Sequence, residues 1–437
     1  MIKSIQHIFS IPELRRRILF TLGMLAVYRV GCHVPTPGIN AQVLAKFFEG
    51  TQGTLLGMVS AFTGGALRRM TVFALGIMPY ISASIILQLL GVVYEPVERL
   101  QKEGEQGHKI ITKWTRYGTV VLSVIQGAGI AVGLQSMRGP AGEPVVMHPG
   151  IGFIVMTVIT LTAGTAFLMW LGEQVTERGI GNGISLIIFA GIVANMPSAL
   201  ANSIQLINTG AISLFVGLLI LAVMVAVVLA IVFMETGQRR VPIHYAKRVV
   251  GMRSYGGQSS HLPLKVNMSG VIPPIFASSI IMFPATVASL VDIPWVKNVA
   301  SMMTPSHLIY NVFYVAFIVF FCYFYTAITF NPVDVADNVK KQGGYIPGIR
   351  PGKATSEYLD TVLGRLTFAG AIYVSAVCVL PTILIGKFNV PFFFGGTSLL
   401  IVIQVGLDTA QQMEAHLIAR SYEGFMKGVS LSGRHGN

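Results

Sequence analysis

The chain has 437 residues, of which 53% are hydrophobic and only 11% are charged. Soluble domains carry about 25% charged residues, so this composition excludes a soluble fold of this length. The 31 Lys and Arg residues outnumber the 18 Asp and Glu residues and give a formal net charge of +13. A basic balance can indicate nucleic acid binding, but these cations lie between long apolar stretches. The composition therefore indicates a helical protein that crosses a membrane several times.

The N-terminal segment, residues 1–17, is polar and basic and precedes the first apolar stretch. Its Ile5, Ile8 and Phe9 fall on one helical face, and it ends in three consecutive arginines. This pattern predicts a short cytoplasmic helix that lies in the membrane interface. No small-residue cleavage site follows the first apolar stretch, so a cleavable signal peptide is not expected.

Apolar stretches of suitable length occur ten times along the chain. A helix needs about 20 residues to cross the hydrocarbon core. The predicted spans are residues 18–34, 70–93, 115–135, 151–171, 184–201, 211–234, 268–291, 308–330, 361–385 and 396–415. The predicted fold class is therefore an all-α polytopic membrane protein with ten transmembrane helices.

The distribution of basic residues between alternate loops predicts the topology. One face of the membrane receives 24 Lys and Arg residues and the other receives six. By the positive-inside rule, both termini are cytoplasmic. Two cytoplasmic loops, 235–267 and 331–360, are long and rich in Gly, Pro and basic residues. Surplus loop length often serves a function, so these loops are interpreted as a docking surface, the alternative being charge that only sets topology.

Two short motifs recur five spans apart. Residues 79–86 and 273–280 are identical at five of eight positions, and residues 183–188 and 396–401 at four of six. Because five is an odd number, the second set of spans enters the membrane in the opposite sense. This is the signature of an inverted-topology repeat.

The repeat divides the chain into two pseudo-symmetric halves of five spans. The N-terminal half covers residues 18–201 and the C-terminal half covers residues 202–415, with a cytoplasmic tail at 416–437. Pro79 and the Pro273 pair are predicted to interrupt the second and seventh spans, since proline removes a helical hydrogen bond. Inverted repeats place their working site where such helices meet.

The repeated motifs carry isoleucines at helical spacing. Taken singly, such residues are ordinary core or lipid-facing residues. Equivalent positions from both halves would instead form an apolar constriction that excludes hydrated ions. The candidates are Ile81, Ile85, Ile184, Ile188, Ile275 and Ile401. Ile187 is an alternative to Ile184 at the start of the fifth span.

Residues 60–69 are small, contain two glycines and precede the second span on the outer side. They are too few to cross the membrane. The segment is predicted to fold back as a short re-entrant helix that blocks the pore from outside, the alternative being a surface loop.

Ionisable residues are scarce inside the predicted spans: Arg116, Arg365 and Glu414 lie within four residues of a span end, and the two exceptions further inside are Arg29 and Asp408. Arg29 lies towards the outer end of its span, where a long side chain can snorkel. Ion-coupled transporters carry such residues deep in their spans, so an inverted-repeat secondary transporter is the less favoured alternative.

Cys32, Cys322 and Cys378 lack metal-ligand spacing, and no nucleophile–base pair or HExxH motif occurs. The chain is therefore predicted to be neither an enzyme nor a metal or cofactor protein.

Several long motifs in order resemble the bacterial SecY family, the channel subunit of the general protein-secretion translocon. The similar stretches are GGALRRMTVFALGIMPYISASII at 64–86 and residues 177–185, 245–248, 261–267, 346–352 and 391–398. This resemblance implies a protein-conducting channel that moves unfolded secretory polypeptides and releases apolar segments into lipid through a lateral gate. It also implies location in the bacterial inner membrane.

The resemblance assigns roles to residues of this chain. The six isoleucines would form the pore ring. The plug would contain Ser60, Phe62, Gly64, Gly65, Leu67 and Arg68. The lateral gate would include Gln88, Gln126 and Asn267, and Arg253 and Arg350 would dock the SecA motor ATPase or the ribosome. The further expected partners are the small membrane subunits SecE and SecG, the unfolded presecretory polypeptide and membrane lipid.

Overall fold

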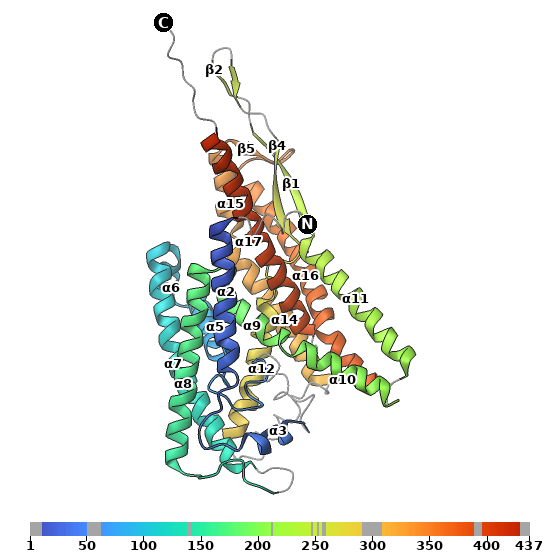
Figure 1. Cartoon of the computed structure of the whole chain (residues 1–437). Helices are drawn as coiled ribbons and strands as arrows, with labels where there is room; N and C mark the ends of the chain where they lie inside the picture. The colour runs from blue at the N-terminus through green and yellow to red at the C-terminus, as the bar shows by residue number, and fades with distance from the viewer. Residues whose placement is uncertain are drawn as a thin grey trace. The chain divides into compact units, whose positions relative to one another are not determined.

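A computed structural model describes residues 11–49, 63–137, 142–210, 213–245, 248–250, 253–255, 259–290, 308–388 and 396–428. Each of the ten predicted spans coincides with a helix, and the fifth coincides with two short ones (Figure 1). The long helices are α2 (Pro12–Gly31), α5 (Met78–Val93), α7 (Glu105–Ser136), α8 (Ile151–Arg178), α9 (Gly183–Val193), α10 (Met196–Asn208), α11 (Leu214–Thr236), α12 (Ile272–Leu290), α14 (Leu308–Thr329), α16 (Lys353–Phe388) and α17 (Gly396–Gly428). The shorter ones are α3 (Ala41–Glu49), α6 (Glu95–Lys102) and α15 (Pro332–Lys341).

Several helices are long and apolar enough to cross a membrane. Within the described ranges there are six by length and composition, or seven if α5 and α6, which are bent by 106° at their junction, count as one span. Helix α11 exposes large apolar side chains along its length, among them Leu218, Leu229 and Phe233. Such extended apolar surface is typical of a helix in a membrane.

The first helix and the last one extend beyond their predicted spans. Helix α2 begins at Pro12, so the three arginines of residues 15–17 belong to the same helix as the first span. Helix α17 continues to Gly428, well past residue 415. Contacts divide the chain into two compact units. Unit 1 contains the chain up to Ser198 and from Val405 onwards, and unit 2 contains residues 199–404.

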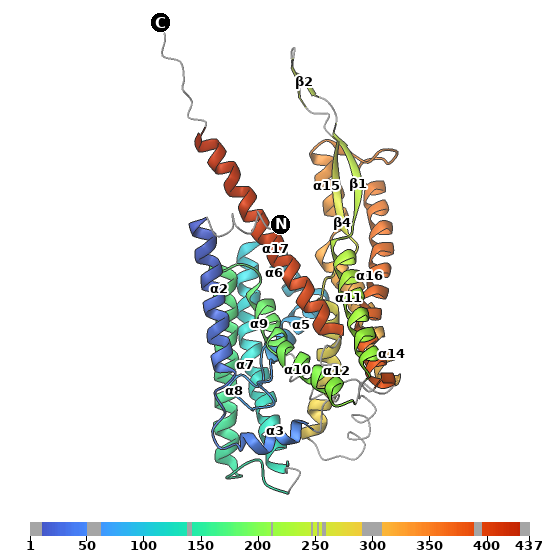
Figure 2. The ribbon, with the colours of Figure 1, turned by 45° about the vertical axis from the view of Figure 1, so that its right-hand side comes forward.

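Unit 1 is built around the long antiparallel pair α7 and α8, which lie side by side in both views (Figures 1 and 2). Helix α7 buries small residues at every fourth position. These residues are Thr115, Thr119, Ser123, Gly127 and Ala131. Small side chains let helix backbones approach closely in membrane proteins. The opposite side of α7 exposes Tyr117, Val121 and Ile125, as expected for a face in contact with lipid.

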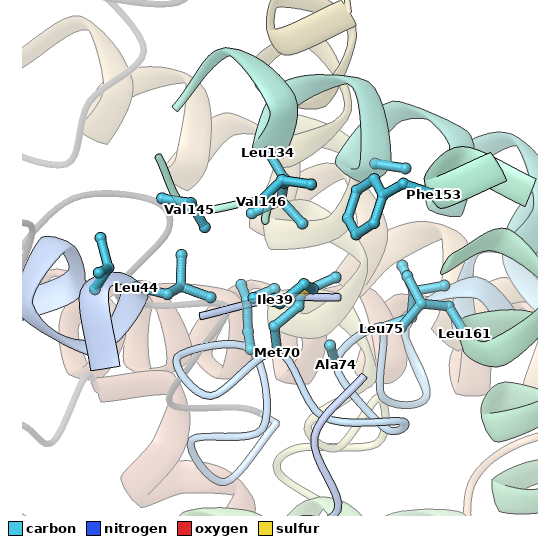
Figure 3. Packing of buried hydrophobic residues seen from close by; sticks show 13 residues of the cluster. Ile39, Leu44, Met70, Ala74, Leu75, Leu134, Val145, Val146, Phe153 and Leu161 are labelled. Atoms are coloured by element: carbon cyan, nitrogen blue, oxygen red, sulfur yellow. The ribbon is translucent and has the colours of Figure 1, made fainter. Parts of the chain in front are cut away.

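An apolar cluster is buried within unit 1 (Figure 3). It combines side chains from α3, from the ends of α7 and α8 and from the connection between them, and from the segment 63–77. Leu67, Met70, Ala74 and Leu75 of that segment are all buried in the cluster. The segment before α5 is therefore part of the core of unit 1.

Unit 2 packs α12, α14 and α16 against one another. Phe276 of α12 meets Phe321 of α14 edge to face, with ring centroids 5.6 Å apart. The hydroxyl of Tyr314 in α14 lies 2.9 Å from Oγ1 of Thr397 and is hydrogen-bonded to it. Because both groups are buried, this bond fixes the first turn of α17 within unit 2.

The two long cytoplasmic loops contain strands that the sequence analysis did not predict. Strands β1 (Gln238–Tyr245) and β4 (Ser259–Lys265) pair antiparallel, and β5 (Gly344–Tyr345) joins the other edge of β1. The sheet order is β4-β1-β5, so the two loops meet in one sheet next to α15 and α16 (Figure 2). A second hairpin pairs β2 (Arg248–Val250) with β3 (Arg253–Tyr255).

The prolines were expected to interrupt helices, and this expectation was wrong. Pro79 lies in the first turn of α5, and Pro273 and Pro274 lie in the first turn of α12. The first turn tolerates proline because its backbone N–H groups have no helical partner. The residues before Pro79, from 63 to 77, are a succession of turns, so the second predicted span is helical only from Met78.

Candidate pore, plug and docking residues

The proline-led helices α5 and α12 present isoleucines at matching positions. Ile81 follows Pro79 by two residues, and Ile275 follows Pro273 by two. Ile81 is buried and Ile275 is half-buried, and Ile85, one turn after Ile81, is also buried. Both helices therefore have a proline as their second residue and an isoleucine two residues after it.

The glycine-led helices α9 and α17 show a second correspondence. An added Cβ at Gly183 would collide with the carbonyl oxygen of Gly172 in α8, and one at Gly396 would collide with the carbonyl oxygen of Val377 in α16. In both units, a helix thus begins against the backbone of the helix before it. Ile188 and Ile401 occupy the fifth position after these glycines, and both are buried.

A loop between α8 and α9 sets the start of α9 through polar contacts. The Oδ1 atom of Asn182 accepts hydrogen bonds from the backbone N–H groups of Ile184 and Ser185 at 3.1 and 3.2 Å, which caps the helix. The N–H of Gly183 donates to Oγ1 of Thr176 at 2.9 Å. The position of the α9 isoleucines therefore depends on this loop.

Ile184 and Ile187 differ in burial at the start of α9. Ile187 is only 1% exposed, and Ile184 is half-buried. A Cβ added at Gly172 of α8 would lie 3.0 Å from Cγ1 of Ile184 and 3.6 Å from Cδ1 of Ile187, so both side chains approach α8 at this glycine. The choice between Ile184 and Ile187 stays a prediction.

The six ring candidates are shared between the two units. Unit 1 contains Ile81, Ile85, Ile184 and Ile188. Unit 2 contains Ile275 and Ile401. Each set is described within its own unit, and the ring as a whole stays a prediction.

The described part of the plug candidate is formed by turns. A re-entrant helix was expected there, and residues 63–69 do not form one. Gly64 and Gly65 have φ angles of 66° and 82°, which glycine adopts more readily than other residues. Leu67 is buried and Arg68 is half-buried, so the alternative of a surface loop is also wrong. Ser60 and Phe62 lie outside the described residues.

Aromatic and backbone contacts hold the segment 63–77 in unit 1. The ring of Phe73 stacks on Tyr28 of α2 at 6.1 Å and on Phe167 of α8 at 5.9 Å. The N–H of Val72 donates to the carbonyl of Val34 at 3.0 Å. These contacts were not predicted, because their partners on α2, on α8 and at Val34 are distant in sequence.

The ionisable residues of the spans have distinct environments. Arg29 was expected to snorkel, but its Nη1 donates to the carbonyl oxygen of Gly64 at 3.0 Å. Asp408 is exposed on α17. Within the part of the chain that the structure describes, no group of three or more His, Cys, Asp and Glu side chains could hold a metal ion.

The three gate candidates belong to different units. Gln88 of α5 and Gln126 of α7 are half-buried in unit 1, and Nε2 of Gln88 donates to Oγ of Ser84 at 3.3 Å. Asn267 is buried in unit 2, just before α12. Their assembly into one gate stays a prediction.

Asn267 is the centre of a buried polar group. Its Nδ2 donates to Oε1 of Glu235 at 2.7 Å and to the carbonyl of Gly270 at 3.2 Å. Its Oδ1 accepts from Oγ of Ser269 and from the N–H of Gly270, each at 3.1 Å. Glu235 is 8% exposed near the end of α11. The sequence analysis missed Glu235 because it lies one residue beyond the predicted sixth span.

The docking candidate Arg350 is exposed on an anchored turn. Ile346 and Ile349 pack in an apolar cluster with Val241 of β1 and Leu359 of α16. The carbonyl oxygen of Arg350 accepts a hydrogen bond from Oγ1 of Thr355 at 2.9 Å. The backbone of this turn is therefore fixed, and the cationic side chain of Arg350 is exposed. Arg253 begins β3, where it pairs with Val250.

Comparison with known proteins identifies close relatives. A family model described as SecY matches residues 71–410. The chain is 51% identical over 428 residues to the protein translocase subunit SecY of Escherichia coli strain K12, covering 97% of this chain and 96% of the relative. It is 45% identical over 428 residues to the protein of the same description from Aquifex aeolicus, covering 98% of this chain and all of that relative.

Solved structures share the fold at low sequence identity. One is of a SecY protein whose plug domain stabilises the closed state of the translocation channel and maintains a membrane seal. It has a TM-score of 0.66 and 18% identity, covering 95% of this chain and 97% of that one. Another is Sec61 in the canine ribosome–channel complex from the endoplasmic reticulum, with a TM-score of 0.61 and 17% identity at the same coverage.

The buried pair Asn267 and Glu235 predicts a coupled loss of stability. Replacing Asn267 with Ala leaves the Glu235 carboxylate without this donor, and we expect a loss of about 1–3 kcal/mol in unfolding free energy. Thermal unfolding of the purified protein in detergent measures the effect. In a double-mutant cycle, Asn267→Ala and Glu235→Ala should be non-additive. The exposed control, Asn338→Ala in α15, should change little, and additive single effects would contradict the coupling.

Proposed function

Because this chain belongs to the SecY family, we propose that it is the protein-conducting channel through which unfolded secretory polypeptides cross the bacterial inner membrane. The observation that carries the proposal is the match to translocase subunits over 97% of the chain. The apolar helices place the chain in the membrane as a multi-pass protein. A channel subunit makes and breaks no covalent bond, so the chain is not an enzyme.

The partners follow from the same relationship. The channel works with the small membrane subunits SecE and SecG and with the SecA motor ATPase or the translating ribosome. The similar fold of Sec61 in a ribosome–channel complex supports the ribosome as a partner. The chain has no GxxxxGK[ST] motif, so the energy for transport comes from the motor, from chain elongation or from the membrane potential.

The pore of this channel is sealed by apolar side chains. The six isoleucines form the constriction, and the turns of residues 63–69 belong to the plug that closes it. Branched apolar side chains exclude hydrated ions by dewetting and conform to a passing polypeptide. Matching isoleucine positions after Pro79 and Pro273, and after Gly183 and Gly396, support this assignment. They occur at equivalent starts of helices in both units.

The gate sorts each segment of cargo by its summed hydrophobicity. Gln88 of α5, Gln126 of α7 and Asn267 just before α12 belong to the elements that open sideways towards lipid. Apolar residues favour insertion by roughly 0.3–0.6 kcal/mol each, and a central charge opposes it by about 2.5–3.5 kcal/mol. The summed contribution of about 20 residues therefore decides whether a segment of cargo enters the lipid. A channel of this kind needs no site that reads sequence.

The secondary-transporter alternative is not supported. It requires ionisable side chains that bind a coupling ion in the middle of the membrane. Arg29 instead bonds to a backbone carbonyl, and Glu235 lies near the cytoplasmic end of α11 with Asn267 as a donor. The relatives of the chain are translocase subunits.

Reconstitution tests the proposed function directly. The full chain with its small membrane subunits is placed in lipid vesicles with the motor ATPase, ATP and an unfolded presecretory polypeptide. We expect the polypeptide to become resistant to added protease until detergent dissolves the vesicles. Vesicles that lack the chain are the control. A polypeptide that stays fully digestible in the complete system would overturn the proposal.

Polar substitutions in the ring should make the resting channel leak. We expect the triple variant of Ile81, Ile275 and Ile401 to Asn to raise resting ion conductance several-fold, because hydrated side chains no longer dewet the constriction. It should also accept presecretory proteins with defective signal sequences. Planar-bilayer recording measures the conductance, with the three corresponding Ile→Val changes as the control. Conductance equal to that of the unchanged channel would exclude these residues from the ring.

Charge reversal at Arg350 should impair motor-driven export without impairing membrane insertion of the channel itself. We expect Arg350→Glu to reduce motor-driven export about tenfold or more, since a like charge at an interface is strongly unfavourable. Membrane insertion of the variant channel itself should be normal, because Arg350 is exposed. Export of a labelled preprotein into inverted membrane vesicles measures the effect. Lys109→Glu, a reversal on an exposed residue of α7, is the matched control, and equal export by both variants would remove the docking role.

A further inference from the structure

Two consecutive residues of α2 bind the first described residues of the plug segment. The hydroxyl of Tyr28 donates to the carbonyl oxygen of Thr63 at 3.4 Å. Nη1 of Arg29 donates to the carbonyl oxygen of Gly64 at 3.0 Å. Tyr28, Thr63 and Gly64 are buried, and Arg29 is half-buried. All of these residues lie in unit 1.

The acceptor of Arg29 is positioned from its other side by α9. A Cβ added at Gly64 would lie 2.9 Å from Cα of Gly191 in α9 and 3.3 Å from Nη1 of Arg29. The φ angle of Gly64 is 66°, a left-handed conformation that side chains disfavour. The backbone at Gly64 is thus held between the Arg29 guanidinium and the α9 backbone, with no room for a side chain.

The chemistry of this contact explains a cation in an apolar span. Ionisable side chains inside membranes are unfavourable and usually have a function. Backbone carbonyls outside a helix need a partner in the membrane. The carbonyls of Thr63 and Gly65 accept turn hydrogen bonds from the N–H groups of Ala66 and Arg69, and the carbonyl of Gly64 accepts from Arg29. A guanidinium keeps its charge and supplies several donors in fixed directions. It therefore holds a bare backbone carbonyl more firmly than a neutral donor does.

We propose that Arg29 is a positioning residue that latches the plug in its closed position through the carbonyl of Gly64, with Tyr28 as a weaker second donor at Thr63. This inference rests on the proposed channel function. The latch acts on the backbone of Thr63 and Gly64, so these two hydrogen bonds must break when the cargo displaces this end of the segment. Arg29 lines no part of the translocation path in this scheme.

Substitution of Arg29 in the full, reconstituted channel tests the latch. Loss of one charge-assisted hydrogen bond shifts a closed-to-open equilibrium by about 10- to 100-fold, so Arg29→Met should raise the resting open probability by that order. The open probability should rise less in Arg29→Lys, and less still in Tyr28→Phe. Lys46→Met, which removes an exposed cation from α3, is the matched control and should leave conductance unchanged.

A double variant separates a latch from a merely structural role. Gly64→Val displaces the acceptor, so adding Arg29→Met to it should raise conductance no further. Additive increases, or wild-type conductance in Arg29→Met, would overturn the latch. If Arg29→Met does not accumulate in membranes, the same cycle is run with Arg29→Lys. Failure of the unchanged channel to protect a preprotein from protease would instead overturn the channel function.

Discussion

The need to satisfy every backbone polar group inside a bilayer governs this structure. Helices meet that need internally, whereas turns at membrane depth require partners from neighbouring elements. The segment 63–77 is such a run of turns, and α2 and the residues after it supply its partners. Tyr28 and Arg29 bind the carbonyls of Thr63 and Gly64, and the carbonyl of Val34 accepts from the N–H of Val72. The hydrogen bonds to Thr63 and Gly64 can break without unfolding a helix, whereas Leu67, Met70 and Leu75 are fixed in the core of unit 1.

The two halves of the internal repeat resemble each other in the residues at the starts of their helices. A proline is the second residue of both α5 and α12, where the first-turn N–H groups need no helical partner. A glycine begins α9 and α17, each pressed against a backbone carbonyl of the helix before it. The motifs common to the two halves thus specify local geometry at helix starts. The isoleucines keep their positions relative to these starts, which is why a short motif can preserve a site.

Hydrophobicity was sufficient to predict the helices at all ten spans, because apolar length is a strong signal. It failed at residues 70–77, where an apolar sequence forms turns whose partners lie on α2 and α8. It also failed for β1, although Val241 and Ile243 are buried on one face and alternate with exposed Arg240 and Pro242. Glu235 was missed because it directly follows a predicted span, and its hydrogen-bond partner Asn267 lies 32 residues later in the chain.

The sheet β4-β1-β5 has a mechanical consequence within unit 2. It joins two connections that are about 100 residues apart in sequence, and its apolar underside is continuous with the first turns of α16 through Leu359 and Leu363. Helix α16 is 36 residues long. Because the sheet and the first turns of α16 share one apolar cluster, a displacement of the sheet would move the start of α16 with it.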